Sequence, residues 1–280
     1  MKWLFTGRKL RRLGILAMNR RNTECILDLN PRVAYPLVDD KYRLHCLCRK
    51  IEVPTPNLYA LVESHSQLRQ LSTILNQLED FVIKPGRGAG GRGILVVKGR
   101  ENGELVRHNG MAIQIDELRQ HVSDVISGLY SLGGRSDQAL IQQRVVLDPR
   151  FRSISYQGIG DIRVICYRGV PAMAMLRLPT RQSEGRANLH QGGIGAGVDL
   201  ETGVTHHAVM NNRLAERHPD TGESVIGFQV PHWDEILEMA GRVAANVELG
   251  YLGVDIVLDA QGPLLLEANA RPGLAIQIAN

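Results

Sequence analysis

The spacing of apolar residues predicts four helices. A stripe along residues 68–78 follows Ser64 and Gln67, which together read as a capping box at a helix start. A second stripe runs along residues 115–129, and a third along residues 233–247 directly after Pro231. A shorter helix is predicted to open at Asp39-Asp40-Lys41 and to run through Lys50.

Short apolar runs between these helices predict strands. The last two, Val254–Leu258 and Leu264–Glu267, are joined by a four-residue turn and predict a hairpin. We expect residues 192–197, which are rich in glycine, to form a flexible loop, and residues 133–137 to form a boundary. Strands and helices that alternate with hairpins predict an α+β protein of two lobes. The other predicted strands are Phe81–Ile83, Ile94–Val97, Ala139–Val146, Ile162–Tyr167 and Val170–Leu176.

Charge is distributed unevenly along the chain. The 280 residues hold 33 Lys and Arg against 29 Asp and Glu, a net charge of +4. Seven of the cations lie in residues 1–21, before the first acid, Glu24, so the rest of the chain carries 26 cations against 29 acids, a net −3. This balance does not indicate a nucleic-acid partner for the body of the protein. It leaves open a peripheral contact of residues 1–21 with a membrane surface or another acidic partner.

The remaining composition narrows the class of protein. With 44% hydrophobic residues, the chain has enough apolar content for one large domain or two modest ones. Its longest apolar stretches fall short of the roughly 20 residues that a helix needs to span a bilayer. Four cysteines in a chain of this length suggest reduced thiols, which predicts a cytoplasmic protein. No oligomeric state is indicated.

A glycine-rich segment, Gly86–Gly93, separates two predicted strands. Its G-x-G-x-x-G pattern is followed by a β-branched run rather than by a helix, which excludes a dinucleotide-binding turn, and it lacks the Lys-Ser/Thr end of a Walker A loop. A glycine-rich hairpin tip can close its backbone amides over phosphate oxygens, with Lys84 at its hinge as a point charge. The alternative is a mobile hairpin with a solvated lysine.

Asp255, Glu267 and Asn269 form a second group of candidate residues. The predicted hairpin brings Asp255 near Glu267, and the period-2 alternation of a strand puts Glu267 and Asn269 on one face. Two carboxylates and an amide oxygen suit Mg²⁺, which binds through one or two carboxylates plus phosphate. The alternative is that Asp255, inside an apolar strand, is a buried carboxylate paired with an arginine or a backbone amide.

From about Asn19 to the C-terminus these motifs, in this order, resemble the ATP-grasp superfamily of carboxylate–amine ligases. The chain is most similar to the alpha-L-glutamate ligase-like branch, including the sugar-transfer-associated group. The resemblance implies a fold of two α+β lobes that grip ATP between them. It implies three regions: a basic segment 1–39 in place of a full preceding lobe, an N-terminal lobe 40–138 and a C-terminal lobe 139–280. The chain also ends seven residues after Gly273, where relatives continue with a helix.

The resemblance also implies roles for individual residues. Lys41 and Lys84 would contact phosphate, and Gly88, Gly90 and Gly91 would belong to the lid. The linker strand would hydrogen-bond adenine, and Gln142 stands where relatives often have Glu. Asp161 would reach ribose, Arg163 would lie near phosphates or substrate, and Arg271 would hold an anionic substrate. The remaining assignments are Gln143 and Val145 at adenine, Arg177, Asn188 and His190 around the reacting centre, and Asp255, Glu267 and Asn269 at the metal.

The activity that the resemblance implies is amide or peptide bond formation through an acyl phosphate. ATP and Mg²⁺, with Mn²⁺ as a second option, are the implied cofactors, and small-molecule or peptide carboxylates and amines, glutamate among them, are the implied substrates. We expect Asp255→Ala or Glu267→Ala to abolish Mg·ATP turnover with the fold intact. The alternative is a catalytically degenerate ATP-binding sensor or scaffold, which the short N-terminal segment makes worth testing.

Overall fold

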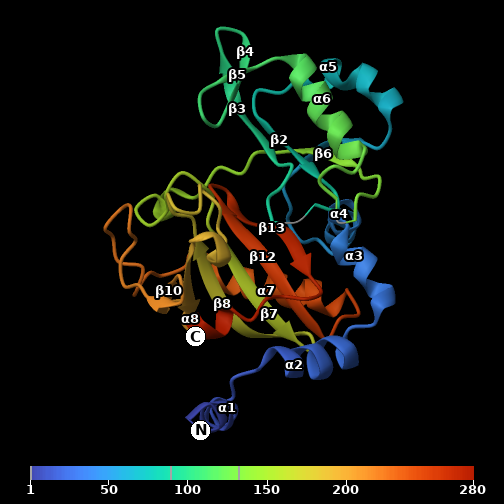
Figure 1. The fold of residues 1–280 in the computed structure, drawn as a ribbon. Coiled ribbons are helices and arrows are strands. Elements are labelled where there is room, and N and C mark those ends of the chain that lie inside the picture. Colours follow the sequence, from blue (N-terminus) through green and yellow to red (C-terminus); the bar gives the residue numbers. More distant parts are fainter. Residues whose placement is uncertain (1, 89, 132) are drawn as a thin grey trace. The chain divides into compact units, whose positions relative to one another are not determined.

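A computed structural model describes residues 2–88, 90–131 and 133–280, with side chains from residue 7 onward; Ala89 of the glycine segment and the Lys2 side chain lie outside them. The chain divides into two compact units (Figure 1). Unit 1 comprises residues 1–39, 47–54 and 147–280, and unit 2 comprises residues 40–46 and 55–146. Helix α4 (Lys41–Lys50) covers the residues for which a helix was predicted. Its first residues belong to unit 2 and its last residues to unit 1.

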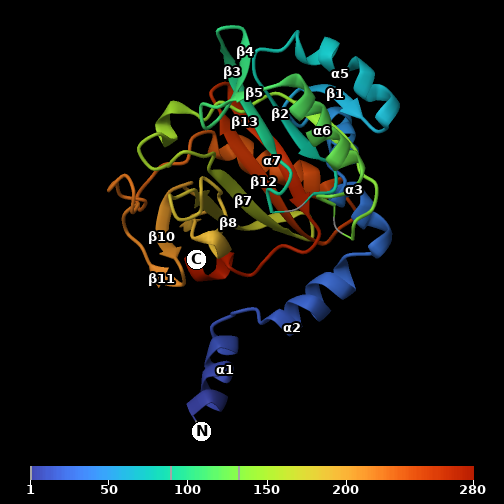
Figure 2. The ribbon, with the colours of Figure 1, turned by 45° about the horizontal axis from the view of Figure 1, so that its top comes forward.

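Unit 2 is an antiparallel six-stranded sheet covered by two helices. The strand order is β1-β6-β2-β3-β4-β5. Helices α5 and α6 lie against this sheet (Figure 2). Their apolar stripes pack against it, with Leu71, Leu118 and Phe81 fully buried in one core. The elements are β1 (Leu58–Val62), α5 (Leu68–Leu75), β2 (Phe81–Pro85), β3 (Leu95–Glu101), β4 (Glu104–Arg107), β5 (Ala112–Ile113), α6 (Ile115–Ile126) and β6 (Ala139–Gln142), with a single turn, His65–Gln67, before α5.

Unit 1 is built on an antiparallel seven-stranded sheet with the order β11-β10-β9-β8-β7-β12-β13. Its strands are β7 (Asp161–Tyr167), β8 (Val170–Leu178), β9 (Ile194–Val198), β10 (Thr205–Met210), β11 (Arg213–Leu214), β12 (Tyr251–Asp259) and β13 (Gly262–Asn269). Its α-helices are α1 (Lys2–Arg12), α2 (Met18–Arg20), α3 (Tyr35–Asp39), α7 (Trp233–Ala245) and α8 (Ile276–Ala279). A π-helix spans Arg21–Leu27, and 3-10 turns span Arg32–Ala34, Pro149–Phe151 and Leu189–Gln191.

The two faces of this sheet are covered differently. Helix α7 packs across β7, β8, β12 and β13 on one face. On the other face, Ile165 and Met175 pack with Cys25 and Ile26 from the N-terminal segment and with Ile276 of α8. Because side chains alternate along a strand, Arg163 shares this second face with Ile165. The second face is therefore apolar at one end of the strands and charged at the other.

The observed boundaries differ from the expected ones in two places. Residues 139–146 group with unit 2 rather than with the C-terminal lobe, because Ala139–Gln142 forms β6 and pairs with both β1 and β2. Residues 47–54 group with unit 1, where the Leu265 amide donates to the Pro54 carbonyl. Side-chain spacing along one segment does not reveal such hydrogen-bonded partners.

The glycine-rich segment 192–197 is not a flexible loop. Ile194–Val198 forms β9, a fully buried strand between β8 and β10. A Cβ at Gly197 would lie 2.2 Å from the carbonyl oxygen of Ala279 in α8. Glycine here permits close approach of another backbone rather than mobility, which is the usual meaning of glycine inside a strand. Among the described residues, no helix is long and apolar enough to cross a bilayer.

Candidate nucleotide and substrate site

Four charged side chains of unit 1 form one buried network on the sheet. Asp255 of β12 lies directly opposite Arg163 of β7, and Asp161 lies opposite Arg177 of β8. Arg163 donates through Nε to Asp255 Oδ1 at 2.7 Å and through Nη2 to Oδ2 at 2.5 Å. Arg177 donates to Asp161 at 2.5 and 2.7 Å, and its Nη2 also reaches Asp255 Oδ2 at 2.8 Å. The network thus joins three of the predicted substrate and nucleotide residues to the predicted metal ligand Asp255.

Glu267 and Asn269 lie beside this network, and we call the six side chains together the charged cluster: Asp161, Arg163, Arg177, Asp255, Glu267 and Asn269. The hairpin pairs Asp255 with Glu267 across β12 and β13, as the sequence predicted. Asn269 Nδ2 lies 3.4 Å from Asp255 Oδ2 and 3.4 Å from Glu267 Oε1, so the three side chains converge. With Asp161, Glu267 and Asp255 against Arg163 and Arg177, the charged cluster carries one excess negative charge at neutral pH.

Burial and neighbouring charge act in opposite directions on the two aspartates. Burial raises the pKa of Asp161 to about 6, outweighing the contrary effect of Arg177, and the charge of Asp255 adds to the rise. Burial also opposes ionisation of Asp255, but Arg163 and Arg177 outweigh it and hold the pKa of Asp255 below its ordinary value. Asp255 is therefore the ionised partner of both arginines, and Asp161 is the group on which the excess negative charge is least stable.

The donor atoms of the charged cluster fit a hard divalent cation. Mg²⁺ prefers oxygen ligands, and Asp255 and Glu267 provide carboxylate oxygens from one strand pair. The Asn269 amide turns its nitrogen toward both carboxylates, so a rotation of this amide would bring its oxygen to the same point. Among the described residues, no group of three or more His, Cys, Asp and Glu side chains is placed to hold a metal ion, so the candidate ligands are two carboxylates and one amide. The arginine pairing that the sequence left as an alternative for Asp255 is present. Oδ2 of Asp255 accepts from both arginines, whereas Oδ1 accepts from Arg163 Nε, so the metal hypothesis requires a cation to bind Asp255 through Oδ1.

The other predicted residues of unit 1 lie in three distinct settings. Arg271 is 56% exposed at its side chain, its guanidinium lies 5.3 Å from the Tyr35 ring centroid, and its Nη2 lies 3.7 Å from Asp39 Oδ2. Asn188 accepts the His190 amide through Oδ1 at 3.0 Å and so shapes the 188–193 turn. The His190 ring is exposed on this turn. A direct role in the reaction remains a prediction for all three.

In unit 2, the glycine segment connects β2 to β3 as a hairpin loop, and its first residues are held by several polar contacts. Lys41 Nζ donates to the Gly88 carbonyl at 2.8 Å. Buried Asp40 caps α4, accepts from Gln138 Nε2 at 2.7 Å and pairs with Arg87 at 3.2 Å. Lys41 therefore points its ammonium at the loop, as a phosphate-binding lysine would need to.

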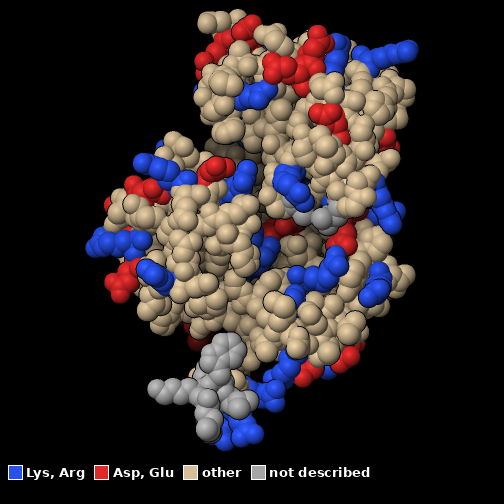
Figure 3. All heavy atoms as spheres, in the orientation of Figure 1, with Lys and Arg blue, Asp and Glu red and all other residues tan. Residues whose placement is uncertain are grey.

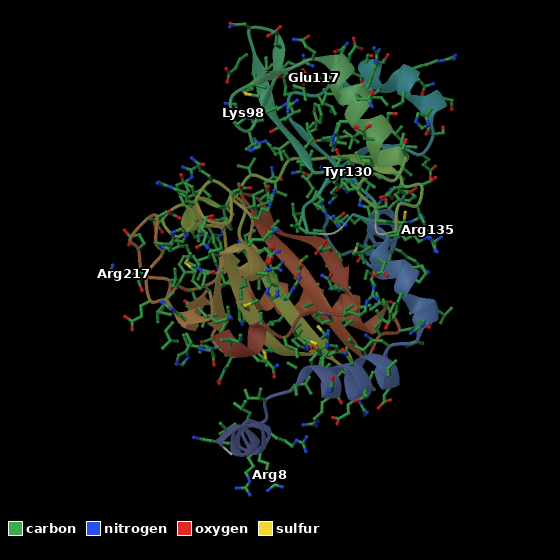
Figure 4. All side chains as sticks on the ribbon, in the orientation of Figure 1. Arg8, Lys98, Glu117, Tyr130, Arg135 and Arg217 are labelled. Carbon is green, nitrogen blue, oxygen red and sulfur yellow. The ribbon has the colours of Figure 1, made fainter. Side chains whose placement is uncertain are left out.

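The end of the loop is also held, while its tip is open. His121 Nε2 bonds the Gly93 carbonyl at 3.0 Å, and a Cβ at Gly93 would strike the Tyr130 ring, which is labelled in Figure 4. Gly90 and Gly91 have φ of +65° and +74°, and a Cβ at either would meet nothing within 4 Å. These two residues adopt a backbone that favours glycine and have room to move.

The predicted adenine linker is β6 and the residues that follow it. Gln142 is buried, and its Oε1 is a buried acceptor with no hydrogen-bond partner among the described residues. The Gln143 amide donates to the Asn57 carbonyl at 2.8 Å, and Val145 is buried. Lys84 lies on β2 opposite Leu140 of the linker strand. Nucleotide binding by these residues stays a prediction, and the orphan acceptor of Gln142 is the observation that favours it.

The contacts that Asp40 and Asp137 make with the glycine segment were not predicted from the sequence. Asp40 was expected to open a helix and to precede Lys41 in an Asp-Lys motif that resembles the family's, but with no contacts of its own. Asp137, which accepts the Arg87 amide at 3.0 Å, lay in an expected boundary. Four basic residues of α1 are exposed: Arg8, Lys9, Arg11 and Arg12. Arg8 is labelled in Figure 4, and Figure 3 shows Lys and Arg side chains at this end of the chain. Contact of α1 with an acidic partner remains a prediction.

The fold is that of ATP-grasp ligases. The family described as "Sugar-transfer associated ATP-grasp" matches residues 20–280, and the chain belongs to this family. The chain is similar to D-alanyl-alanine synthetase A from Vibrio cholerae, at a TM-score of 0.51 and 14% identity, over 86% of this chain and 57% of that one.

Two further solved structures match the chain at lower similarity. A RimK domain protein ATP-grasp from Sphaerobacter thermophilus matches at a TM-score of 0.49 and 11% identity, over 90% of this chain and 68% of that one. The ATP-grasp ligase PsnB, complexed with minimal precursor, Mg and ADP, matches at a TM-score of 0.43 and 16% identity, over 88% of this chain and 54% of that one. The chain thus spans little more than half the length of several of these ligases. Comparison with curated proteins gives no match.

Proposed function

We propose that this chain is an ATP-dependent carboxylate–amine ligase that forms an amide or peptide bond, with glutamate or a similar amino acid as one substrate. The observation that carries the proposal is the charged cluster of unit 1, where two guanidinium groups and three carboxylates meet on one sheet face. Such a cluster suits a reaction between anions, because a carboxylate and a triphosphate repel each other. Membership of the ATP-grasp family supports the same assignment.

The reaction proceeds in two balanced steps. A substrate carboxylate oxygen attacks the γ-phosphorus of ATP, so that an acyl phosphate forms and ADP leaves. The amine nitrogen then attacks the acyl carbon, phosphate leaves and the nitrogen loses a proton. Neither step needs an enzyme nucleophile, so the residues contribute positioning and charge stabilisation.

The residues have distinct tasks in this scheme. Lys41, Lys84 and the amides of Gly88, Gly90 and Gly91 hold phosphate oxygens, and the open tip at Gly90–Gly91 moves to exclude water, which would otherwise hydrolyse the acyl phosphate. The nucleoside contacts are assigned to Gln142, Gln143 and Val145 for adenine and to Asp161 for ribose. Arg163 and Arg177 hold phosphate or carboxylate oxygens, Asn188 and His190 border the reacting centre, and Arg271 binds the substrate anion.

Mg²⁺, or Mn²⁺ in its place, would be held by Asp255, Glu267 and Asn269, and when bound it offsets the charge of the triphosphate. The charged cluster supports this, because it carries one excess negative charge and presents oxygen ligands of the type that these ions prefer. Asp255 already shares its charge with Arg163 and Arg177.

The test is release of ADP and phosphate from ATP on a panel of amino acids and peptides, with the products identified by mass spectrometry. We expect release that needs both a carboxylate and an amine, and a new amide in the product. Binding of ATP without release on any pair would instead support the catalytically degenerate sensor or scaffold. Glu267→Gln serves as the control, since it should retain the fold and lose metal-dependent turnover.

A further inference from the structure

The turn that follows β13, the last strand of unit 1, is contacted by residues that are distant in the sequence. Ala270-Arg271-Pro272 comes directly after Asn269, a residue of the charged cluster. Pro272 folds back onto β12, where a Cβ on Gly253 would lie 2.8 Å from Pro272 Cβ. Gly253 pairs with Asn269 in the sheet and lies two residues before Asp255. The placement of this turn therefore fixes the surroundings of Asn269.

Each of the three residues in this turn is contacted by a different part of residues 20–39, which we call the N-terminal brace. Asn30 Nδ2 donates to the Ala270 carbonyl at 2.7 Å. Asp39 and the Tyr35 ring flank Arg271. Arg21 Nη1 donates to the Pro272 carbonyl at 3.0 Å. Three consecutive residues are thus held by contacts that span more than 200 positions of sequence.

The brace is itself firmly attached to the sheet. Asn30 is 3% exposed and also bonds both backbone groups of Tyr251, donating to its carbonyl at 2.7 Å and accepting from its amide at 2.9 Å. Gly250 donates to the Leu29 carbonyl at 2.9 Å, and Cys25 and Ile26 pack in the apolar cluster on the sheet face. Buried polar side chains with all partners satisfied specify one arrangement, because any other leaves groups unpaired.

We propose that the N-terminal brace positions the 270–272 turn for ligation, so that Asn30, Arg21 and Tyr35 set how well Asn269 serves the metal and Arg271 serves the substrate anion. The inference rests on the proposed function for its kinetic consequence. It concerns positioning residues, which act through Asn269 and Arg271 rather than on the reacting atoms. It assigns residues 20–39 a part in the active site.

Kinetics with three variants test the proposal. Arg21→Gln and Tyr35→Leu each remove one contact at a partly exposed residue, and Asn30→Ala removes the central one. We expect the KM for the substrate carboxylate and the Mg²⁺ concentration for half-maximal rate to rise about tenfold, in the range seen when groups that orient metal ligands are lost. Asn246→Ala is the matched control, because this exposed asparagine follows α7 and its Nδ2 donates to the Arg242 carbonyl of that helix at 2.8 Å. Unchanged KM and Mg²⁺ dependence in all three variants would overturn the proposal.

Hydrogen exchange separates this inference from the proposed function. In wild-type protein without ligands, amides of residues 267–277 should exchange slowly, and Asn30→Ala or Arg21→Gln should speed their exchange while leaving α7 unchanged. Equal exchange in wild type and variants would overturn the brace even if the enzyme is active. If wild type releases no phosphate on any substrate pair, the proposed function fails, whereas the exchange result still decides whether the brace holds the turn.

Discussion

Asp255→Ala removes the carboxylate on which two buried arginines depend. The side chain of Asp255 is 2% exposed and those of Arg163 and Arg177 are 16% and 12% exposed. After the substitution Arg177 keeps Asp161, but Arg163 loses both of the hydrogen bonds that it makes among the described residues. An uncompensated buried charge costs stability. We therefore expect Asp255→Ala to be less stable than wild type, rather than to keep its fold intact as the sequence alone suggested.

The size of the effect follows from the number of charges left unpaired. Removing one partner of a buried ion pair costs about 3–5 kcal/mol, a large part of the roughly 5–15 kcal/mol that stabilises a folded protein. With an m-value near 3 kcal/mol per molar urea, the unfolding midpoint of unit 1 should fall by about 1–2 M. Trp233, buried in unit 1, reports this unfolding by fluorescence in a Trp3→Phe background.

A second variant makes the reasoning refutable. Asp255→Ala combined with Arg163→Met removes the orphaned charge together with its partner, and it should recover much of the lost stability because a buried pair replaced by apolar groups is often neutral. Urea unfolding of wild type and both variants, followed under the same buffer conditions, gives the comparison. If Asp255→Ala unfolds at the wild-type midpoint, or if the double variant is less stable than the single one, the network does not stabilise unit 1 as argued.

Four further predictions concern single sites. Glu267→Gln, at a partly exposed position, should lose metal-dependent phosphate release while its unfolding midpoint stays near wild type; a large loss of stability would contradict this. Gly91→Val forces a β-branched residue to φ near +74° and should raise the KM for ATP. The control Gly103→Val, at φ +85° in the β3–β4 turn, should leave the KM for ATP unchanged. Equal effects of the two substitutions would refute a role for the loop tip. The pKa of Asp161 is raised to about 6, so the folded state holds the Asp161 proton more tightly than the unfolded state does. The stability that this proton contributes therefore falls as pH rises from about 4 to 6. In metal-free buffer the stability of Asp161→Asn relative to wild type should rise over this range, and a constant difference would refute the pKa shift. Iodoacetamide at pH 8 should modify exposed Cys46 first, as judged by peptide mass spectrometry, because burial raises the thiol pKa of the other three cysteines, Cys25, Cys48 and Cys166, the last two to about 12.

The sequence predicted the local features of the candidate site correctly. Hairpin β12–β13 pairs Asp255 with Glu267 as expected, because a short turn between two apolar runs leaves little choice of register. The glycine segment lies between two neighbouring antiparallel strands, as its flanking apolar runs indicated. Segment 192–197 was misread, because glycine content alone does not distinguish a mobile loop from a strand that another backbone approaches closely.

What the sequence by itself determined is therefore a set of short-range pieces: the stripes of the helices, the final hairpin and the lysine and glycine groups beside their strands. Tertiary structure alone decided that Arg163 faces Asp255 from 92 positions away and that Asn30 holds the turn at Ala270. The reason is that these pairings depend on the order β8-β7-β12-β13 and on which face the N-terminal segment covers. Strand order is set by burying the apolar surface of the whole sheet, and no single segment carries that information.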